Sequence, residues 1–496
     1  MKKLLYYLIA ISFISIISPK SISASHLMGS DLTWTCIGQD SFLIKLVVYR
    51  YCNGITLSTS PINFYCATTG ASITSLSIGI GTPVDITPVS SSGCTRCSDP
   101  GCSFPYGIHR YVMQGIVKLS GTGSCCEIRM SWYQSARNAA ITTSTGAGTA
   151  DLYIEAQLNR CQNPCDNSPV FSNMPVAILC NEQDFTYSHG VYDADTFATG
   201  GLSDSLVFSW TPPLGAKDFP IPYLGQYDYN KPIYFLGFPD TSLTLPSGFH
   251  LNTETGDISF RPMKNEVTIM VLNVKEYRNG QLIGVIRRDM QMIVISCDVI
   301  APIISTNGST KKNTIKLGES ITMNFSTIYT SSVDSMFISW NKSIPNAIWT
   351  DNNGTTRTPT GTFYWKPESN QLSNLPYMFT VIVRKNSSPM NSQYSESFQI
   401  YVKRSIPTGI FIEKVSNDIL VFPNPASDAC LIELKNKELK IISARLIDAE
   451  GRSVKNYSRV NSNELNIARD QLNTGNYIIR LDVSNGKSYS EKITFK

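Results

Sequence analysis

Short apolar runs recur along the whole chain, separated by segments rich in Gly, Ser, Thr, Asn and Pro. The run from Phe42 to Tyr49 is apolar on both faces, as in a strand buried between two layers. Others alternate apolar and polar residues, as from Tyr477 to Val483. We find no long segment of helical period after the N-terminus. The pattern predicts an all-β protein of tandem antiparallel β-sandwich domains.

The N-terminus has the features of a signal peptide over residues 1–24. Lys2 and Lys3 precede an apolar run from Leu4 to Ser18, and Ile22-Ser-Ala24 is an acceptable cleavage site. The run is shorter than the ~20 residues that a transmembrane helix needs. The mature chain should therefore begin at Ser25, without a transmembrane segment. A retained N-terminal anchor is the alternative.

The 496 residues are too many for one hydrophobic core. Pro, Gly and Ser clusters divide the mature chain into several expected parts. These are a Cys-rich β domain (25–167), two β-sandwiches that we call the second module (168–297) and the third module (298–403), a linker (404–418) and a small Ig-like sandwich (419–496).

Cysteines are concentrated in the first part, with ten of the thirteen between Cys36 and Cys165. In an exported chain they are expected to form disulfides, although Cys94-x-x-Cys97 could also suggest zinc. The vicinal Cys125 and Cys126 should have different partners, and the remaining pairings stay open. Cys180 and Cys297 bracket the second module, so we expect them to be bonded.

The charge pattern and the histidines point away from nucleic acid and from catalysis. Charged residues make up 16% of the chain and the net charge is +4, without a clustered basic surface. The four histidines are scattered, and His-Glu-x-x-His, Gly-x-Ser-x-Gly and phosphate-loop motifs are absent from the sequence. We therefore expect a protein that is not an enzyme. The alternative is a secreted hydrolase, a glycosidase or peptidase, with its site in the Cys-rich domain, since paired carboxylates have no local motif.

The second and third modules share a loose repeat. Ser209-Trp210-Thr recurs as Ser339-Trp340-Asn, and Gly256–Pro262 recurs as Gly361–Pro367. The two modules are thus expected to be diverged copies of one fold. Asn279-Gly280 in the second module predicts a hairpin. Its charged residues should form cross-strand pairs, or alternatively a ligand patch; they are Glu276, Arg278, Arg287, Arg288 and Asp289.

Acidic residues in the second module resemble the calcium-binding segment of cadherin-like repeats. Asp193-Ala-Asp195 is followed by Asp204-Ser-Leu. The resemblance implies that Asp193, Asp195 and Asp204 supply carboxylates to Ca²⁺, which prefers several oxygen ligands. Residues 196–203 interrupt the family pattern, and a solvated acidic turn is the alternative. No other cofactor is expected.

The last part carries three further motifs, Phe422-Pro423-Asn424-Pro425, Asp448-x-x-Gly451-Arg452-x-Val454 and Leu472-x-x-Gly475-x-Tyr477. Together they resemble the C-terminal sorting domain of the type IX (Por) secretion system. The resemblance implies an Ig-like sandwich that directs export through that machinery to the outer cell surface of a Gram-negative bacterium or to the medium. An ordinary Ig-like module is the alternative.

The start of the mature chain resembles a family of bacterial surface β-proteins found beside gliding-motility components. The resemblance rests on Ser25-His26 and on Tyr49-Arg50-Tyr51-Cys52, with Tyr51 in place of an acidic residue. We therefore expect an adhesive, binding or envelope-structural role, with a surface glycan or a protein as the ligand.

Overall fold

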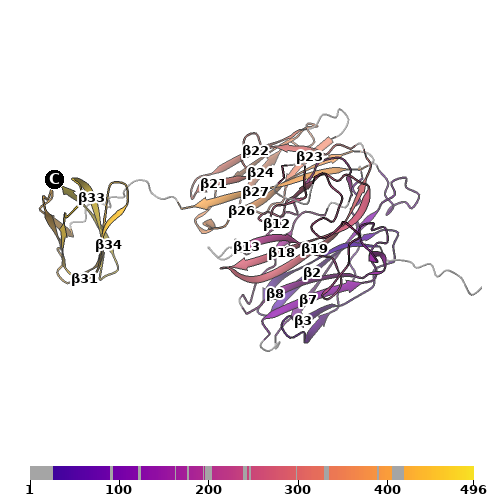
Figure 1. Ribbon diagram of the computed structural model, residues 1–496, viewed down its shortest axis with the longest axis horizontal. Helices are drawn as coiled ribbons and strands as arrows, with labels where there is room; N and C mark the ends of the chain where they lie inside the picture. The colour runs from indigo at the N-terminus through magenta and orange to yellow at the C-terminus, as the bar shows by residue number, and fades with distance from the viewer. Residues whose placement is uncertain are drawn as a thin grey trace, which may run out of the picture. The chain divides into compact units, whose positions relative to one another are not determined.

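The computed structural model describes residues 26–496 apart from 90–92, 121–124, 162, 176–177, 194, 196–203, 238–242, 245–246, 298, 329–334, 388–389 and 405–417. The expected signal peptide lies outside the described residues. The chain divides into two compact units, Met1–Ser405 and Ile406–Lys496, called here the N-terminal and C-terminal units. Both are built from strands, which confirms the predicted all-β class (Figure 1). The helical segments in the described part are short 3-10 turns, among them η1 (Ala147–Thr149) and η3 (Ser369–Gln371).

A 14-stranded sheet runs through the first 295 residues of the N-terminal unit. Its main path has the order β4-β3-β7-β8-β19-β1-β2-β6-β5. The strands of this path are β1 (Leu27–Gly38), β2 (Ser41–Tyr51), β3 (Ile62–Cys66), β4 (Ser72–Leu76), β5 (Val84–Asp85), β6 (Ile108–Lys118), β7 (Glu127–Gln134), β8 (Leu152–Asn159) and β19 (Gln281–Ile295). The remaining strands are β10 (Ile178–Cys180), β13 (Ser205–Trp210), β14 (Leu214–Ala216), β15 (Phe219–Pro220) and β18 (Glu266–Arg278).

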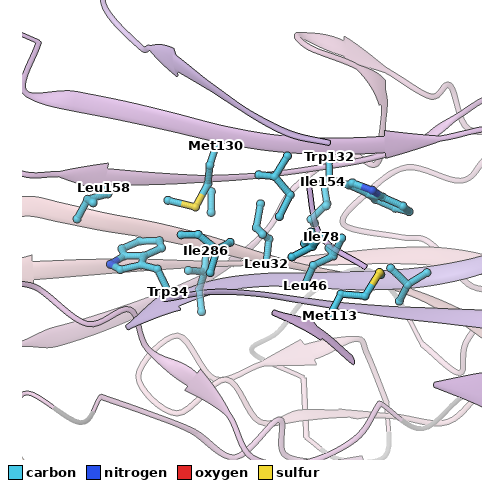
Figure 2. Close-up of a cluster of buried hydrophobic side chains, with 14 of the residues drawn as sticks. Leu32, Trp34, Leu46, Ile78, Met113, Met130, Trp132, Ile154, Leu158 and Ile286 are labelled. Carbon is cyan, nitrogen blue, oxygen red and sulfur yellow. The ribbon is translucent and has the colours of Figure 1, made fainter. Parts of the chain in front are cut away.

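The core of the Cys-rich region lies between two parts of this sheet. Figure 2 shows Met130 and Trp132 of β7 on one side, facing Leu32 and Trp34 of β1 on the other. These side chains are at most 3% exposed. The long apolar run in β2 is buried on both faces over much of its length, as its sequence predicts. Burial of such large side chains contributes roughly 1.5–3 kcal/mol each to folding.

Strand β19 belongs to two sheet segments at once. It pairs along its full length with β18 of the second module, and it also pairs with β1 and β8 of the Cys-rich region. In Figure 1, β18 and β19 accordingly lie between the purple strands β7 and β8 and the orange strands of the third module. The expected boundary at residues 167/168 thus falls within one continuous sheet.

Four of the five charged residues named for the β18–β19 hairpin form ion pairs with residues outside it; they are Arg278, Arg287, Arg288 and Asp289. The side chains directly opposite them are not charged; Leu272, for example, lies opposite Arg288. Arg288 Nε instead donates to Asp31 at 2.7 Å, and Arg137 Nη1 donates to Asp289 at 2.8 Å. The pairing within the hairpin that the sequence suggested is replaced by pairing between segments. Removing one partner of such a buried ion pair costs about 3–5 kcal/mol.

The second and third modules have the same strand pairing. In the second, β10 is parallel to β19, which continues to β18 and β13. In the third, β21 is parallel to β27, which continues to β26 and β23. A second sheet has the order β11-β17-β16 in one module and β20-β22-β25-β24 in the other. The strands not yet bounded are β9 (Val170–Phe171), β11 (Phe185–Tyr187), β12 (Val191–Tyr192), β16 (His250–Leu251), β17 (Ile258–Phe260), β20 (Ile303–Ser305), β21 (Lys312–Lys316), β22 (Ile321–Ile328), β23 (Ser335–Trp340), β24 (Ile348–Asp351), β25 (Thr360–Trp365), β26 (Tyr377–Asn386) and β27 (Ser392–Lys403).

The repeated residues occupy equivalent places in these two modules. Trp210 and Trp340 are the last residues of β13 and β23, while Phe260 and Trp365 are the last residues of β17 and β25. All four pack against hydrophobic cores. The sequence repeat therefore marks the same two strand ends in each copy.

Disulfides connect twelve of the thirteen cysteines. They are Cys36–Cys165, Cys52–Cys97, Cys66–Cys125, Cys94–Cys102, Cys126–Cys161 and Cys180–Cys297. Cys125 and Cys126 thus have different partners, and the cysteines considered for zinc are bonded to other cysteines. Cys430 is the free thiol, and it is buried in the C-terminal unit.

The C-terminal unit is a small sandwich of two sheets, β28-β29-β32 and β31-β30-β33-β34. Its strands are β28 (Ile419–Phe422), β29 (Ala429–Leu434), β30 (Ile441–Ile447), β31 (Ser453–Ser462), β32 (Glu464–Ala468), β33 (Gly475–Val483) and β34 (Ser488–Phe495). The last turn contains Asn485-Gly486, where Gly486 has the positive φ of 79°. The last pair of this hairpin is Asp482 with Ser488, so the loop contains more residues than Asn485 and Gly486 alone.

Candidate functional site

The second module contains a cluster of five buried carboxylates, which we call the acidic cluster. Asp193 follows β12, and Asp204 directly precedes β13. Asp166 follows the disulfide-bonded Cys165, and Glu276 lies near the end of β18. Asp195 is the fifth member, and all five residues are at most 6% exposed. The cluster therefore joins the end of the Cys-rich region to loops and a strand of the second module.

The carboxylate oxygens lie close enough to share a cation. Oxygens of Asp166, Asp195 and Asp204 all lie within 4.8 Å of one another, as do oxygens of Asp193, Asp204 and Glu276. Asp204 belongs to both sets. Several converging carboxylates match the oxygen coordination that Ca²⁺ prefers.

One guanidinium neutralises part of this charge. Arg278 Nε donates to Asp204 Oδ1 at 2.6 Å, and its Nη2 also donates to Asp204. Nη2 lies 3.3 Å from Asp166 and 3.7 Å from Asp195. Backbone and amide groups of Asn167 satisfy Asp195 further. Asp204 and Asp195 are therefore compensated, whereas neither carboxylate oxygen of Glu276 has a hydrogen-bond partner among the described residues.

Burial raises the pKa of three of the carboxyls in the cluster. Desolvation, together with the neighbouring Asp195, raises the pKa of Asp166 to about 8. Desolvation raises the pKa of Asp193 to about 8 as well. The pKa of Glu276 is also raised, mainly by burial and then by the negative charges of Asp166 and Asp193. Without a cation, Asp166 and Asp193 would hold protons near neutral pH.

Among the residues of the acidic cluster, Glu276 gives the strongest indication of a bound cation. It is 0% exposed, and neither of its carboxylate oxygens has a hydrogen-bond partner. Gly284, its neighbour on β19, leaves room for this carboxylate, because a Cβ there would lie 2.6 Å from Glu276 Oε2. A buried carboxylate without partners costs several kcal/mol unless it is protonated or bound.

The acidic cluster borders a pocket of about 260 Å³ in the N-terminal unit. Asp193 and Asp204 line this pocket together with Glu254. Tyr377 and Tyr401 of the third module also line it. A cation from solution would thus have a route to the carboxylates.

Sequence reasoning identified part of this set. The structure brings Asp193, Asp195 and Asp204 together, although they come from both sides of residues 196–203. Asp166 and Glu276 were not assigned to the site. The Asn279-Gly280 turn alone would place Ile283 opposite Glu276, and a register shift between Glu276 and Tyr277 brings Gly284 there instead, so the sequence carries no signal for this residue. Asp166 gave no local signal.

The motifs of the C-terminal unit fall into two groups. Some residues hold turns and strand ends in place. Asn424 donates to Lys492 O and accepts from Thr494 N, at 2.6 and 2.9 Å, so it binds the start of the unit to β34. Tyr477 donates to Asn473 O at 2.9 Å. Gly475 begins β33.

Asp448 organises the central turn of the sorting motif. It accepts hydrogen bonds from the backbone of Glu450 and from the backbone and side chain of Arg452, and these bonds lower its pKa. Gly451 supplies the positive φ of 82° that the turn requires. The other group is exposed; it contains Phe422, Pro423 and Pro425, and the exposed Arg452 belongs to both groups.

Residues 420–496 match the family described as "Secretion system C-terminal sorting domain". This confirms the resemblance inferred from the three motifs, and it marks the chain as an exported protein of the cell surface or the medium. No helix among the described residues has the length and hydropathy needed to cross a bilayer. No curated protein matches the chain.

Several solved structures show remote similarity. One is SGBP-B of the Bacteroides ovatus mixed-linkage glucan utilization locus, in complex with a mixed-linkage heptasaccharide (12% identity, 67% of this chain and 69% of that chain covered, TM-score 0.13). Another comprises zebrafish RET cadherin-like domains 1 to 4 (10% identity, 66% and 96% covered, TM-score 0.16). A third comprises the N-terminal four Ig domains of Dscam1 (8% identity, 95% and 99% covered, TM-score 0.18).

Proposed function

We propose that this protein is exported through the type IX pathway and acts at the bacterial surface as a binding or structural protein. The C-terminal unit directs export, and the N-terminal unit supplies the surface activity. The family match over residues 420–496 carries this proposal. It is supported by the compact C-terminal unit, because an export signal that folds by itself can be recognised whatever precedes it.

The N-terminal unit suits the outside of a cell. Six disulfides and a sheet that continues between modules resist unfolding where no chaperone is available. We propose that the unit binds a surface glycan or another envelope protein and does not catalyse a reaction. Release of products from polysaccharide or protein substrates by the purified protein would contradict this and favour a hydrolase site in the Cys-rich region.

Export is tested by fusing residues 406–496 to a reporter carrying a signal peptide, in a bacterium that has the type IX pathway. The fused reporter should reach the cell surface or the medium. Asp448→Ala should reduce export strongly, because it removes the acceptor that closes the turn at Gly451. Glu438→Gln, an exposed change elsewhere in the same unit, is the control.

Mass spectrometry of the native protein completes the test. We expect the mature chain to begin at Ser25 and to end within residues 404–417, before the sorting domain. Retention of the reporter in the periplasm with the intact domain would refute the export proposal. An exported protein that keeps Lys496 would instead make the C-terminal unit a retained anchor.

We also propose that the acidic cluster binds Ca²⁺. The observation that favours this is Glu276, buried without a hydrogen-bond partner and within 4.8 Å of Asp193 and Asp204 oxygens. Arg278 places its positive charge next to Asp204, Asp166 and Asp195. Bound Ca²⁺ would supply positive charge next to Glu276 as well. It would also connect the segment after β12, the segment before β13 and strand β18, and so make the second module more rigid.

Calcium binding is tested by thermal unfolding in EDTA and in excess Ca²⁺. A ligand at about 100 times its dissociation constant stabilises the folded state by ~2.7 kcal/mol. The melting temperature should therefore rise with Ca²⁺, and Glu276→Gln should reduce the rise. Glu127→Gln, an exposed residue of β7, is the control. An identical melting temperature in EDTA and Ca²⁺ would remove the calcium site.

A further inference from the structure

A larger pocket lies elsewhere in the N-terminal unit, at a place where three parts of the chain meet. Its volume is about 470 Å³, within the range of small-molecule sites. Strands β5 and β6 of the Cys-rich region line one side. Residues 174–185 of the second module and 384–393 of the third module contribute the other sides, through the residues of these ranges that the structure describes. The pocket is separate from the acidic cluster.

Most of the pocket wall is apolar. The apolar side chains come from all three parts of the chain and include Ile86, Ile108, Ile178, Leu179, Phe185 and Met390. Several of them are also packed in hydrophobic cores, so the wall is preformed. A ligand would therefore bury an apolar body here without first ordering the site.

Two arginines of the wall have no acidic partner. Neither Arg110 nor Arg384 forms an ion pair with a described carboxylate. Arg110 Nε is buried and has no hydrogen-bond partner, while its Nη1 lies 3.5 Å from the sulfur of Met174. Arg384 Nε donates to Gln393 at 3.0 Å. The pocket thus holds two guanidinium groups with unused donors.

The protein around Arg384 disfavours the charged form of its guanidinium. Its side chain remains accessible to solvent, yet the protein around it removes part of its hydration and lowers the pKa of the guanidinium. An anion bound in the pocket would stabilise the charged guanidinium through charge-assisted hydrogen bonds, in place of the hydration that it has lost.

The acidic residues of the wall are already bonded to other groups. Asp85 accepts hydrogen bonds from Thr87, at 2.9 Å from the backbone and 2.6 Å from the hydroxyl, and it also accepts one from Thr95. Asp184 pairs with Arg261 at 2.7 Å. They do not neutralise the two arginines, but their presence would repel a ligand with two negative charges. A single negative charge fits this balance best.

We propose that this pocket binds a small monocarboxylate with an apolar body, whose carboxylate is held by Arg110 and Arg384. Planar guanidinium groups match the geometry of a carboxylate, and the apolar wall receives the remainder of the molecule. The inference concerns the N-terminal unit and does not depend on the route of export.

The test compares two probes of nearly equal shape on the mature protein by isothermal titration calorimetry. 3-Phenylpropanoate carries the carboxylate, and 3-phenylpropanamide is its neutral counterpart. The acid should bind at a single site, about ten times or more tighter than the amide, since charged hydrogen bonds are lost with the amide. Arg110→Gln and Arg384→Gln should each remove most of this preference.

Arg357→Gln, an exposed arginine outside the pocket, is the matched control and should bind as the unchanged protein does. Arg384 is accessible to solvent, so its variant should fold even if the Arg110 variant does not. Equal affinity for acid and amide would overturn the proposal, as would no binding of the acid at millimolar concentration or an unchanged preference in Arg384→Gln.

Discussion

The second and third modules share one strand pairing but bury opposite charges at the same position. Trp210 pairs with Leu272 in the second module and Trp340 pairs with Val381 in the third, so the two registers can be aligned. Four residues further along β18 and β26, this alignment places Glu276 opposite Leu206 and Lys385 opposite Met336. Glu276 is 0% exposed and Lys385 is 1% exposed.

This difference shows that the strand framework tolerates either sign of charge at this place, and that the surroundings decide what the charge does. Around Glu276 are further carboxylates and a glycine that leaves space. The second module also has a disulfide, whereas residues 298–403 contain no cysteine. The second module therefore depends on a covalent bond and on charge compensation where the third depends on its core.

The largest effect should come from removing the disulfide of the second module. Cys180 and Cys297 are 117 residues apart. The Cys180→Ala, Cys297→Ala double variant should lose about 4–5 kcal/mol of unfolding free energy in the chain-entropy account. Denaturant unfolding followed by tryptophan fluorescence measures this, since all six tryptophans precede residue 366. An unchanged midpoint would show that the sheet alone holds the module.

A somewhat smaller effect is expected from Arg278→Gln. The Asp204 side chain is fully buried, so loss of the guanidinium leaves an unpaired carboxylate. In EDTA the variant should be destabilised by about 3–4 kcal/mol. Added Ca²⁺ should restore part of that loss, because the cation takes over the compensation. Arg357→Gln is again the control. A loss that Ca²⁺ does not alter would mean that Arg278 acts independently of a metal.

A third effect is a pH dependence of the metal-free protein. Folding raises the pKa of Asp166 and Asp193 to about 8, above the unfolded value of about 3.9. Their stabilising contribution is therefore complete below about pH 4 and is lost as the pH rises through about 8. Burial raises the pKa of Asp257 to about 6, so this residue also lowers the stability of the folded state as the pH rises.

In EDTA the denaturation midpoint of the N-terminal unit should fall from pH 5 to pH 9. Saturating Ca²⁺ should flatten this slope, because the cation replaces the protons on the carboxylates. A midpoint that rises with pH in EDTA would contradict the assignment of these carboxyls as protonated in the folded state.

Local patterns predicted much of the fold. The alternating run from Tyr477 to Val483 lies in β33 (Gly475–Val483), and Asn279-Gly280 forms the hairpin with positive φ at both residues. Both predictions depend only on neighbouring residues, namely alternation in the first case and backbone freedom in the second. The sorting motifs succeeded for a related reason, because each is a short run of residues that can be read without knowledge of distant contacts.

Long-range pairing could not be predicted. Asp289 bonds to Arg137, which is 152 positions away, and Asp31 bonds to Arg288 at a separation of 257. Nothing in the alternation of β19 indicates that it will join two sheet segments. The acidic cluster was found only in part for the same reason, since Asp166 reaches it through the path of the chain rather than through a motif.

The position of β19 has a consequence for how the protein is made. Until residues 281–295 have been synthesised, β1 lacks the neighbour on its second side and presents unpaired backbone groups, as an open sheet edge does. Completion of the first sheet thus awaits more than half of the chain, and pairing across such sequence distances is slow. The N-terminal unit therefore cannot complete its sheet while it is being synthesised, and its folding must follow translation of β19.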